Sequence, residues 1–149
     1  MEKFTGYAIK VTGGNYAYYK SKQRIGFSEH TFKRLNHEIP AGTRLLIYIT
    51  GLKEIQDDAI VTETFAQTAD ETPYNSQYPY MLGLKFSVLP ASSRPVPLAR
   101  VREILERDNP ELAMGPYQRR FPLQSYSWLP ISREDYTLLY ADLLHPSER

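Results

Sequence analysis

The segment IPAGTRLLIYIT, residues 39–50, predicts a short strand that is apolar on both of its faces. A Pro-Ala-Gly turn opens the segment, and the run that follows lacks the alternation of apolar and polar residues expected of a half-exposed strand. Such a strand is covered on both faces of a sheet or forms one strand of a closed barrel. The segments around it therefore have to supply the two covering layers.

Three neighbouring segments also predict strands. FTGYAIKVT, residues 4–12, ends at a Gly-Gly-Asn turn, and AIVTETFA, residues 59–66, is rich in β-branched and aromatic residues. YMLGLKFSVLP, residues 80–90, contains Gly83, which we expect at a bulge or a close approach of two backbones. Strands and helices do not alternate regularly, so a doubly wound parallel sheet is not expected.

Two further segments predict helices, one before the strand at residues 39–50 and one after the strand at residues 80–90. SEHTFKRL, residues 28–35, begins with the possible N-cap Ser28. In PVPLARVREILERD, residues 95–108, Pro97 suits the first turn of a helix. The apolar positions of this second helix, Leu98, Val101 and Leu105, fall on one face.

The segment ISREDYTLLYADLL, residues 131–144, gives the strongest local signal in the chain. Ser132 is the expected N-cap, with Asp135 in the capping-box position. Ile131 and Tyr136 can form the hydrophobic staple before and inside the first turn. One face of the helix is then lined by Tyr136, Leu139, Tyr140 and Leu143.

Composition excludes several classes of protein and of site. The 149 residues suit a single domain spanning residues 1–149. The absence of cysteine excludes a disulfide framework, a cysteine zinc site and a thiol nucleophile. No apolar run approaches the roughly 20 residues of a membrane span, and the first residues do not resemble a signal peptide. We therefore expect a cytoplasmic protein without a membrane partner.

Motifs for catalysis or for a cofactor are missing from the sequence. None of the three histidines, His30, His37 and His145, stands at a metal-ligand spacing with a carboxylate. There is no G-x-S-x-G motif and no phosphate-binding loop of the G-x-x-x-x-G-K-[ST] type. We expect no metal, no cofactor and no enzymatic activity.

Positive charge is concentrated locally although the net charge is only +1. Between residues 3 and 34 the bases outnumber the acids, whereas residues 54–71 are acidic. Ordinary charge scatter on a solvated surface is the alternative interpretation. The basic residues that we expect to contact a nucleic-acid backbone are Lys20, Lys22, Arg24, Lys33, Arg34, Arg119 and Arg120.

The aromatic content is high, with twelve tyrosines, six phenylalanines and one tryptophan. Tyr16 and Tyr18 stand beside the basic segment, and Trp128 precedes the capped helix. Proteins that recognise bases outside a duplex stack them on such rings, while polar groups read the base edge. The alternative is that the rings fill the core or its rim.

The order of these motifs resembles the EVE domain, a family of the PUA-like superfamily that also contains the YTH, PUA and ASCH domains. The resemblance rests on GYAIKVT with its hydroxyl Thr12, on Gly26-Phe27, on the buried strand with Tyr48, and on QYPYMLGLKFSVLP, VPLARVREIL and LPISREDYTLL. The chain departs from the family pattern at Thr43, where the family usually has Asp. It also has more tyrosines between residues 13 and 24 than we expect.

The resemblance implies an α+β fold, a PUA-like curved β-barrel of about six mostly antiparallel strands with flanking helices. It also implies a pocket for a modified base, such as a methylated one, in DNA or RNA. Such a module can be the reader of a modification-dependent restriction system, within a larger nuclease or motor assembly. We expect Trp128 as one wall, Tyr16 or Tyr18 as the second, and Thr12 and Asn15 as edge-reading groups. The full expected pocket is Thr12, Asn15, Tyr16, Tyr18, Phe27, Tyr48, Tyr80, Ser127 and Trp128.

Two other functions stay open on the sequence. One is a binder of a small molecule or modified nucleotide that makes no contact with a polymer, whose affinity would depend little on salt. The other is an ASCH-like enzyme that acts on a modified nucleoside, which would need a general base in the pocket. No residue of the sequence stands out as that base.

Overall fold

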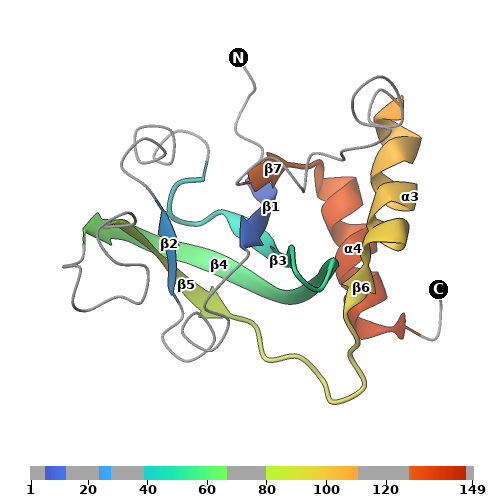
Figure 1. The fold of residues 1–149 in the computed structure, drawn as a ribbon, viewed down its shortest axis with the longest axis horizontal. Coiled ribbons are helices and arrows are strands. Elements are labelled where there is room, and N and C mark those ends of the chain that lie inside the picture. Colours follow the sequence, from blue (N-terminus) through green and yellow to red (C-terminus); the bar gives the residue numbers. More distant parts are fainter. Residues whose placement is uncertain (1–5, 13–23, 28–38, 67–79, 111–127, 147–149) are drawn as a thin grey trace.

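The computed structural model describes residues 6–12, 24–27, 39–66, 80–110 and 128–146 (Figure 1). Seven strands and two helices are present in these ranges. In chain order they are β1 (Tyr7–Thr12), β2 (Arg24–Phe27), β3 (Arg44–Ile49), β4 (Glu54–Ala66), β5 (Tyr80–Phe86), β6 (Val96–Pro97), α3 (Leu98–Asp108), β7 (Trp128–Pro130) and α4 (Arg133–Leu144). The helix expected at residues 28–35, with its N-cap Ser28, lies outside the described residues.

The strands form one mixed sheet in the order β2-β5-β4-β3-β1-β7, and the short β6 pairs with β4. Strands β1 and β3 are parallel, and the other pairs are antiparallel. Among the described strands the sheet ends at β2 and β7, so the predicted closure into a barrel is not confirmed. The α+β class and the mostly antiparallel sheet are confirmed.

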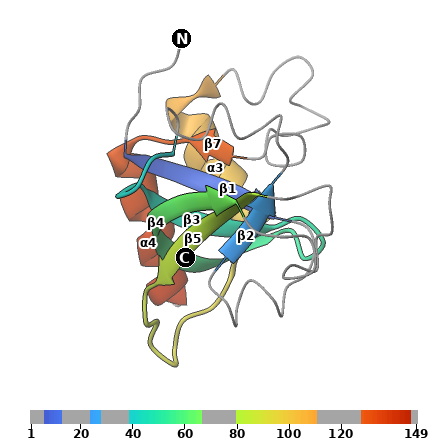
Figure 2. The same cartoon turned by 90° about the vertical axis from the view of Figure 1, so that its left-hand side faces the viewer.

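Strand β3 lies between β1 and β4 and is covered on both faces, as the segment at residues 39–50 predicts. One face of the sheet, called here the Trp128 face, carries Ala8, Ile39, Leu45, Ile47, Ile49, Ala59, Val61, Leu82, Leu84 and Trp128. The other, called the helix face, packs against the two helices, which lie together on one side of the sheet (Figures 1 and 2). Side chains of β3 alternate between the two faces, and both clusters are buried.

Helix α4 begins as its sequence predicts. The Oγ atom of Ser132 accepts a hydrogen bond from the Asp135 N–H at 3.1 Å, which satisfies one of the free donors at the helix start. Ile131 and Tyr136, the expected staple, are both buried in the helix-face cluster. This cap and this staple fix the angle at which the helix leaves β7.

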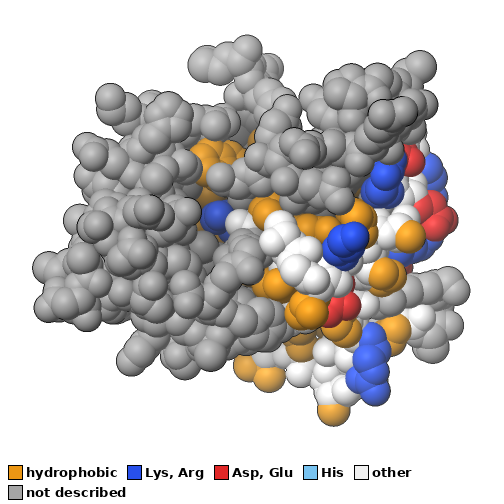
Figure 3. Space-filling view, in the orientation of Figure 1, with side chains coloured by type: hydrophobic (Ala, Val, Ile, Leu, Met, Phe, Trp, Pro, Cys, Tyr) orange, Lys and Arg blue, Asp and Glu red, His pale blue; other side chains and the backbone are white. Residues whose placement is uncertain are grey.

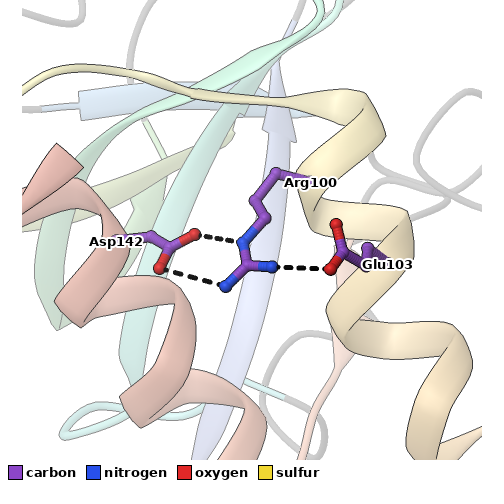
Figure 4. A network of polar contacts seen from close by, with 3 residues as sticks. All are labelled: Arg100, Glu103 and Asp142. Carbon is purple, nitrogen blue, oxygen red and sulfur yellow. Dashed lines mark hydrogen bonds and ion pairs between the residues drawn. The ribbon is translucent and has the colours of Figure 1, made fainter. Parts of the chain in front are cut away.

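Helix α3 packs beside α4, and a charged contact joins them. The Arg100 Nε donates to Asp142 Oδ2 at 2.5 Å, and Arg100 Nη1 donates to Glu103 Oε1 at 2.8 Å (Figure 4). Pro97 is the N-cap residue of α3 and not part of its first turn. Charges of both signs are interspersed over this helix (Figure 3), as is usual for a solvated helix surface. No helix in the described ranges is long and apolar enough to span a membrane.

Gly83 stands at the expected irregularity. The pairing of β4 with β5 shifts between Val61 and Glu63, so Thr62 has no opposite residue. A Cβ atom on Gly83 would lie 2.7 Å from Thr62 Oγ1, closer than real contacts allow. A larger residue at this position would force the Thr62 side chain to shift, because the bulged strand approaches Gly83 closely.

Candidate functional site

The structure describes the side chains of two of the expected pocket residues, Tyr48 and Trp128. Thr12 ends β1, Phe27 ends β2 and Tyr80 begins β5, so their strand positions are known. The expected pocket residues Asn15, Tyr16, Tyr18 and Ser127 lie outside the described residues. Among the expected backbone contacts, Arg24 begins β2, and Lys20, Lys22, Lys33, Arg34, Arg119 and Arg120 lie outside.

Trp128 and Tyr48 are not brought together, because they belong to opposite faces of the sheet. Trp128 is 4% exposed and packs in the cluster of the Trp128 face. Tyr48 is fully buried in the cluster of the helix face, and no group of the described residues forms a hydrogen bond with its hydroxyl. Burial raises the pKa of the Tyr48 hydroxyl because it disfavours the phenolate. Of this pair, Trp128 is the one that shares a face with the end of β1.

Lys10 lies next to Trp128 on the same face. It pairs with Trp128 across β1 and β7 and with Ile47 across β1 and β3. Its side chain is only 4% exposed, and its Nζ donates to the carbonyl oxygen of Val11 at 2.9 Å. Burial lowers the pKa of the Lys10 ammonium to about 8, because a charge is poorly solvated away from water.

Asp57 continues the same row of residues on β4. It pairs with Ile47 and is 9% exposed, so its carboxyl group belongs to the same largely buried face as Lys10. Neighbouring strands are about 4.8 Å apart, which puts the backbones at Lys10 and Asp57 about 10 Å from each other. The Trp128 face thus combines a hydrogen-bond donor, an acceptor and a large ring in an otherwise apolar surface.

Sequence reasoning did not single out Lys10 and Asp57 as candidate site residues. Both are charged residues inside strands, and each stands two residues from an alanine of the buried cluster on the same face, Ala8 for Lys10 and Ala59 for Asp57. In β1 the sequence YAIKVT contains this information, because Lys10 is two residues from the buried Ala8 and alternate residues of a strand lie on the same face. In β4 it is hidden, because the strand begins at Glu54, five residues before the strand expected at residues 59–66.

The helix face carries a second polar group, centred on the fully buried Asp58. Its Oδ1 accepts a hydrogen bond from the Tyr136 hydroxyl, and its Oδ2 accepts from Ser87 Oγ and from Arg44 Nη2, the last at 2.9 Å. The Arg44 guanidinium also lies 5.6 Å from the centre of the Tyr136 ring. Burial and the bond to Asp58 raise the pKa of the Tyr136 hydroxyl. These hydrogen bonds join α4 to β3 and β4 and hold the helix against the helix face of the sheet.

A metal centre finds no support in the described part of the chain. No group of three or more His, Cys, Asp or Glu side chains there could hold a metal ion. The donor set on the Trp128 face, one lysine and one carboxylate, suits hydrogen bonding to an organic ligand.

Comparison with known proteins shows the fold but not the family. No protein-family model matches the sequence, and no curated protein matches it. The YTH domain of the Zygosaccharomyces rouxii MRB1 protein, solved in complex with N6-methyladenosine RNA, matches with a TM-score of 0.62 and 15% identity over 93% of this chain and 86% of that chain. The DUF55 domain of human thymocyte nuclear protein 1 matches with a TM-score of 0.58 and 17% identity, over 91% and 98%.

An ASCH protein from Zymomonas mobilis also matches, with a TM-score of 0.56 and 16% identity over 91% of this chain and 94% of that chain. The YTH, DUF55 and ASCH domains all have the PUA-like fold. The prediction of a PUA-like fold is therefore confirmed. Membership of the EVE family stays a prediction, because identities this low carry no family assignment.

Proposed function

We propose that this protein is a nucleic-acid-binding module that accepts a modified base on the Trp128 face of its sheet. The observation that carries the proposal is the fold shared with a YTH domain in complex with N6-methyladenosine RNA, over 93% of this chain. A second neighbour of the same fold, the mmi1 YTH protein, was also solved with RNA. The ring of Trp128, with Lys10 on the neighbouring strand and Asp57 two strands farther along the same face, supplies stacking and polar groups of the kind that base recognition uses.

The proposal extends to the polymer and its context. The basic residues outside the described ranges, Lys20 and Lys22 among them, would hold the phosphate backbone, which fixes position without reading sequence. A methylated base is the proposed ligand, in DNA or RNA, and a larger nuclease or motor assembly is the proposed partner. Loss of restriction of modified DNA in cells that lack the protein would support that context.

A binding screen tests the proposal. Short oligonucleotides of DNA and RNA that carry 5-methylcytosine, 5-hydroxymethylcytosine or N6-methyladenine are compared with unmodified controls at several salt concentrations. We expect one modified base to be preferred and the affinity to fall steeply with salt, because bound phosphates release counterions. Equal affinity for all oligonucleotides, or no binding, would contradict the proposal. Affinity for free nucleotides without salt dependence would favour the small-molecule alternative.

Trp128→Ala separates a pocket wall from a core residue. Stacking of a base on a ring contributes about 1–3 kcal/mol, so loss of the ring should lower affinity roughly tenfold or more. Because Trp128 is buried, its removal should also destabilise the fold, by about 3–5 kcal/mol if it acts only as core. Affinity is therefore measured per folded molecule, at a temperature well below the melting transition. Unchanged affinity per folded molecule would show that Trp128 is not a pocket wall.

A specific observation favours one alternative, an ASCH-like enzyme. Lys10 is buried with its pKa lowered to about 8, so a fraction of its amine is neutral near physiological pH and can act as a base. The ASCH protein of Zymomonas mobilis shares the fold. We propose binding in preference to catalysis, and chromatography of modified nucleosides incubated with the protein tests the choice. Conversion that is lost in Lys10→Met would establish the enzyme.

A further inference from the structure

The turn that joins β3 to β4, residues 50–53, holds a lysine in a backbone conformation that favours glycine. Lys53 has a φ of 54°, and in the part of the chain that the structure describes it is the one residue other than glycine with a positive φ. In this left-handed region the Cβ atom of an L-residue crowds the following carbonyl oxygen, whereas glycine has no Cβ. A lysine at this position therefore costs the fold stability that a glycine would not.

Backbone hydrogen bonds hold Lys53 in this conformation. Its N–H donates to the carbonyl oxygen of Ile49 at 2.8 Å, and its own carbonyl oxygen accepts from the Leu98 N–H at 3.0 Å. The second bond fastens the turn to the start of α3, beside the pairing of β4 with β6 (Figure 1). The turn is thus held on two sides, which gives its side chains the rigid support that a recognition group needs.

The side chain of Lys53 is available to a ligand outside the chain. It is exposed, and none of the ion pairs among the described residues includes it. The adjacent carboxylate, Glu54, accepts a hydrogen bond from Gln56 Nε2 at 2.8 Å. The ammonium group of Lys53 is therefore a point charge in water, the form in which lysine binds phosphate groups.

The turn lies at the end of the sheet where the proposed base site lies. Strand β1 ends at Thr12, which pairs with Ile49, the last residue of β3. Trp128 pairs with Lys10, two residues before that end, and β1 lies between β7 and β3. From the spacings of strands and of residues along them, the backbones at Trp128 and Ile49 are about 12 Å apart. Because each nucleotide carries a phosphate, a strand with its base at Trp128 can reach the turn with a neighbouring phosphate group.

We propose that Lys53 binds a phosphate group of the nucleic-acid strand whose modified base lies at the Trp128 face. The inference rests on the proposed function, and it identifies where the polymer crosses the described part of the molecule. It adds a contact to those expected from Lys20, Lys22 and the other basic residues outside the described ranges. A phosphate contact fixes position without reading the base, so Lys53 contributes to affinity and not to the preference for a modified base.

Two substitutions remove the charge and suit the turn better than lysine does. Glycine and asparagine both tolerate a left-handed backbone, so Lys53→Gly and Lys53→Asn should melt at or above the wild-type temperature. With the preferred oligonucleotide of the screen, loss of one phosphate contact should reduce the slope of log affinity against log salt by about 0.7–0.9. The loss of affinity should accordingly be roughly threefold larger at ~50 mM salt than at ~200 mM salt.

Two further variants serve as controls. Lys53→Arg keeps the charge in the same backbone conformation and should bind like the wild type. Lys85→Met removes a lysine that is exposed on β5, three strands farther from Trp128 than β1, and should leave affinity and salt slope unchanged.

Each result decides a separate point. Wild-type affinity and salt slope in both Lys53→Gly and Lys53→Asn would overturn the role of Lys53 and leave the proposed function standing. An equal loss in Lys85→Met would reduce the effect to the overall charge of the protein and overturn the contact at the turn. An altered preference among modified bases at an unchanged salt slope would overturn the phosphate contact, because Lys53 would then read the base. A wild type whose affinity does not depend on salt would overturn the proposed function itself, and this inference with it.

Discussion

Replacing Lys10 by Met should stabilise the protein at neutral pH, and the gain should disappear as the pH rises toward 10. A site residue that is kept for binding often lowers the stability of the fold that holds it. Lys10 is buried in an apolar face, where its charge is poorly solvated. Met has a similar length and shape without the charge, so it can fill the same space.

The magnitude follows from the pKa of the lysine. It is lowered from 10.5 to about 8 by burial, and each pKa unit between the folded and unfolded states corresponds to about 1.4 kcal/mol. Holding the charged form in the folded state at pH 7 therefore costs about 3 kcal/mol, which is the upper bound on the gain from Lys10→Met. Replacement of buried charges by apolar residues has often been neutral or stabilising by about 1–4 kcal/mol.

The sign of the pH dependence is opposite to that of a salt-bridged lysine. Below pH 8 both states of the chain carry the proton, and the cost is fully present. Between about pH 8 and 10.5 the unfolded chain keeps the proton and the folded chain loses it, so the stability of the wild type rises with pH. The difference between Lys10→Met and the wild type should shrink over this window.

Urea unfolding followed by circular dichroism at pH 7, 8, 9 and 10 measures this difference. Lys85→Met serves as the matched control, because its side chain is exposed and its loss should change stability by less than about 0.5 kcal/mol at every pH. The reasoning is refuted if Lys10→Met is less stable than the wild type at pH 7. It is refuted equally if the gain is the same at pH 7 and at pH 10.

Four further variants test the packing of the sheet and helices around the site. Asp58→Ala should lower the free energy of unfolding by about 3–5 kcal/mol, because it leaves buried partners unsatisfied, whereas Tyr136→Phe removes one hydrogen bond and should cost about 1–2 kcal/mol; equal losses in urea unfolding would contradict this. Burial and the neighbouring Asp108 raise the pKa of the Asp135 carboxyl to about 7, so wild-type stability should fall as the pH rises from about 4 to 7, and Asp135→Asn should remove this slope in thermal melts across that range. Gly83→Ala should cost about 1–3 kcal/mol, because the new Cβ meets Thr62 Oγ1; a melting temperature like that of the wild type would show that the bulge relaxes freely.

Helix α4 could be predicted from the sequence because its determinants are local. The cap at Ser132, the staple of Ile131 and Tyr136 and the spacing of the apolar residues all lie within residues 131–144. The strand within residues 39–50 could be predicted as well, because its apolar residues indicate burial on both faces whichever strands lie beside it. Local signals of this kind do not depend on the order of strands in the sheet.

The grouping of Tyr48 with Trp128 could not be tested by sequence reasoning for a physical reason. A strand that is covered on both faces lacks the alternation that tells one face from the other. Ile47, Tyr48 and Ile49 are all apolar enough for either layer, so only the register with β1 and β4 assigns Tyr48 to the helix face. Closure of the barrel likewise depends on pairings between distant segments.

The first half of β4 was not predicted as a strand because it is polar and its buried Asp58 is satisfied by partners that are distant in sequence. The run EIQDD was noted only for its acidic charge, yet Asp58 is held by side chains from β3, α4 and the residue after β5. Tertiary contacts of this kind override local propensity, since the strand can hold a carboxylate only where donors from other elements reach it. Asp57 belongs to the same polar run, but its side chain lies on the opposite face of the sheet from Asp58.

The two faces of the sheet are therefore linked through adjacent residues of one strand. Asp58 fixes β4 against α4 and β3, which restricts the backbone at Asp57 and keeps its carboxyl group in the row of Lys10. A recognition group must be held by a rigid support if it is to discriminate between bases that differ in one hydrogen bond. On this reasoning a partial loss of the Asp58 network, as in Tyr136→Phe, should weaken discrimination between modified and unmodified oligonucleotides more than it weakens the affinity for nucleic acid as a whole. Equal loss of both would show that the two faces act independently.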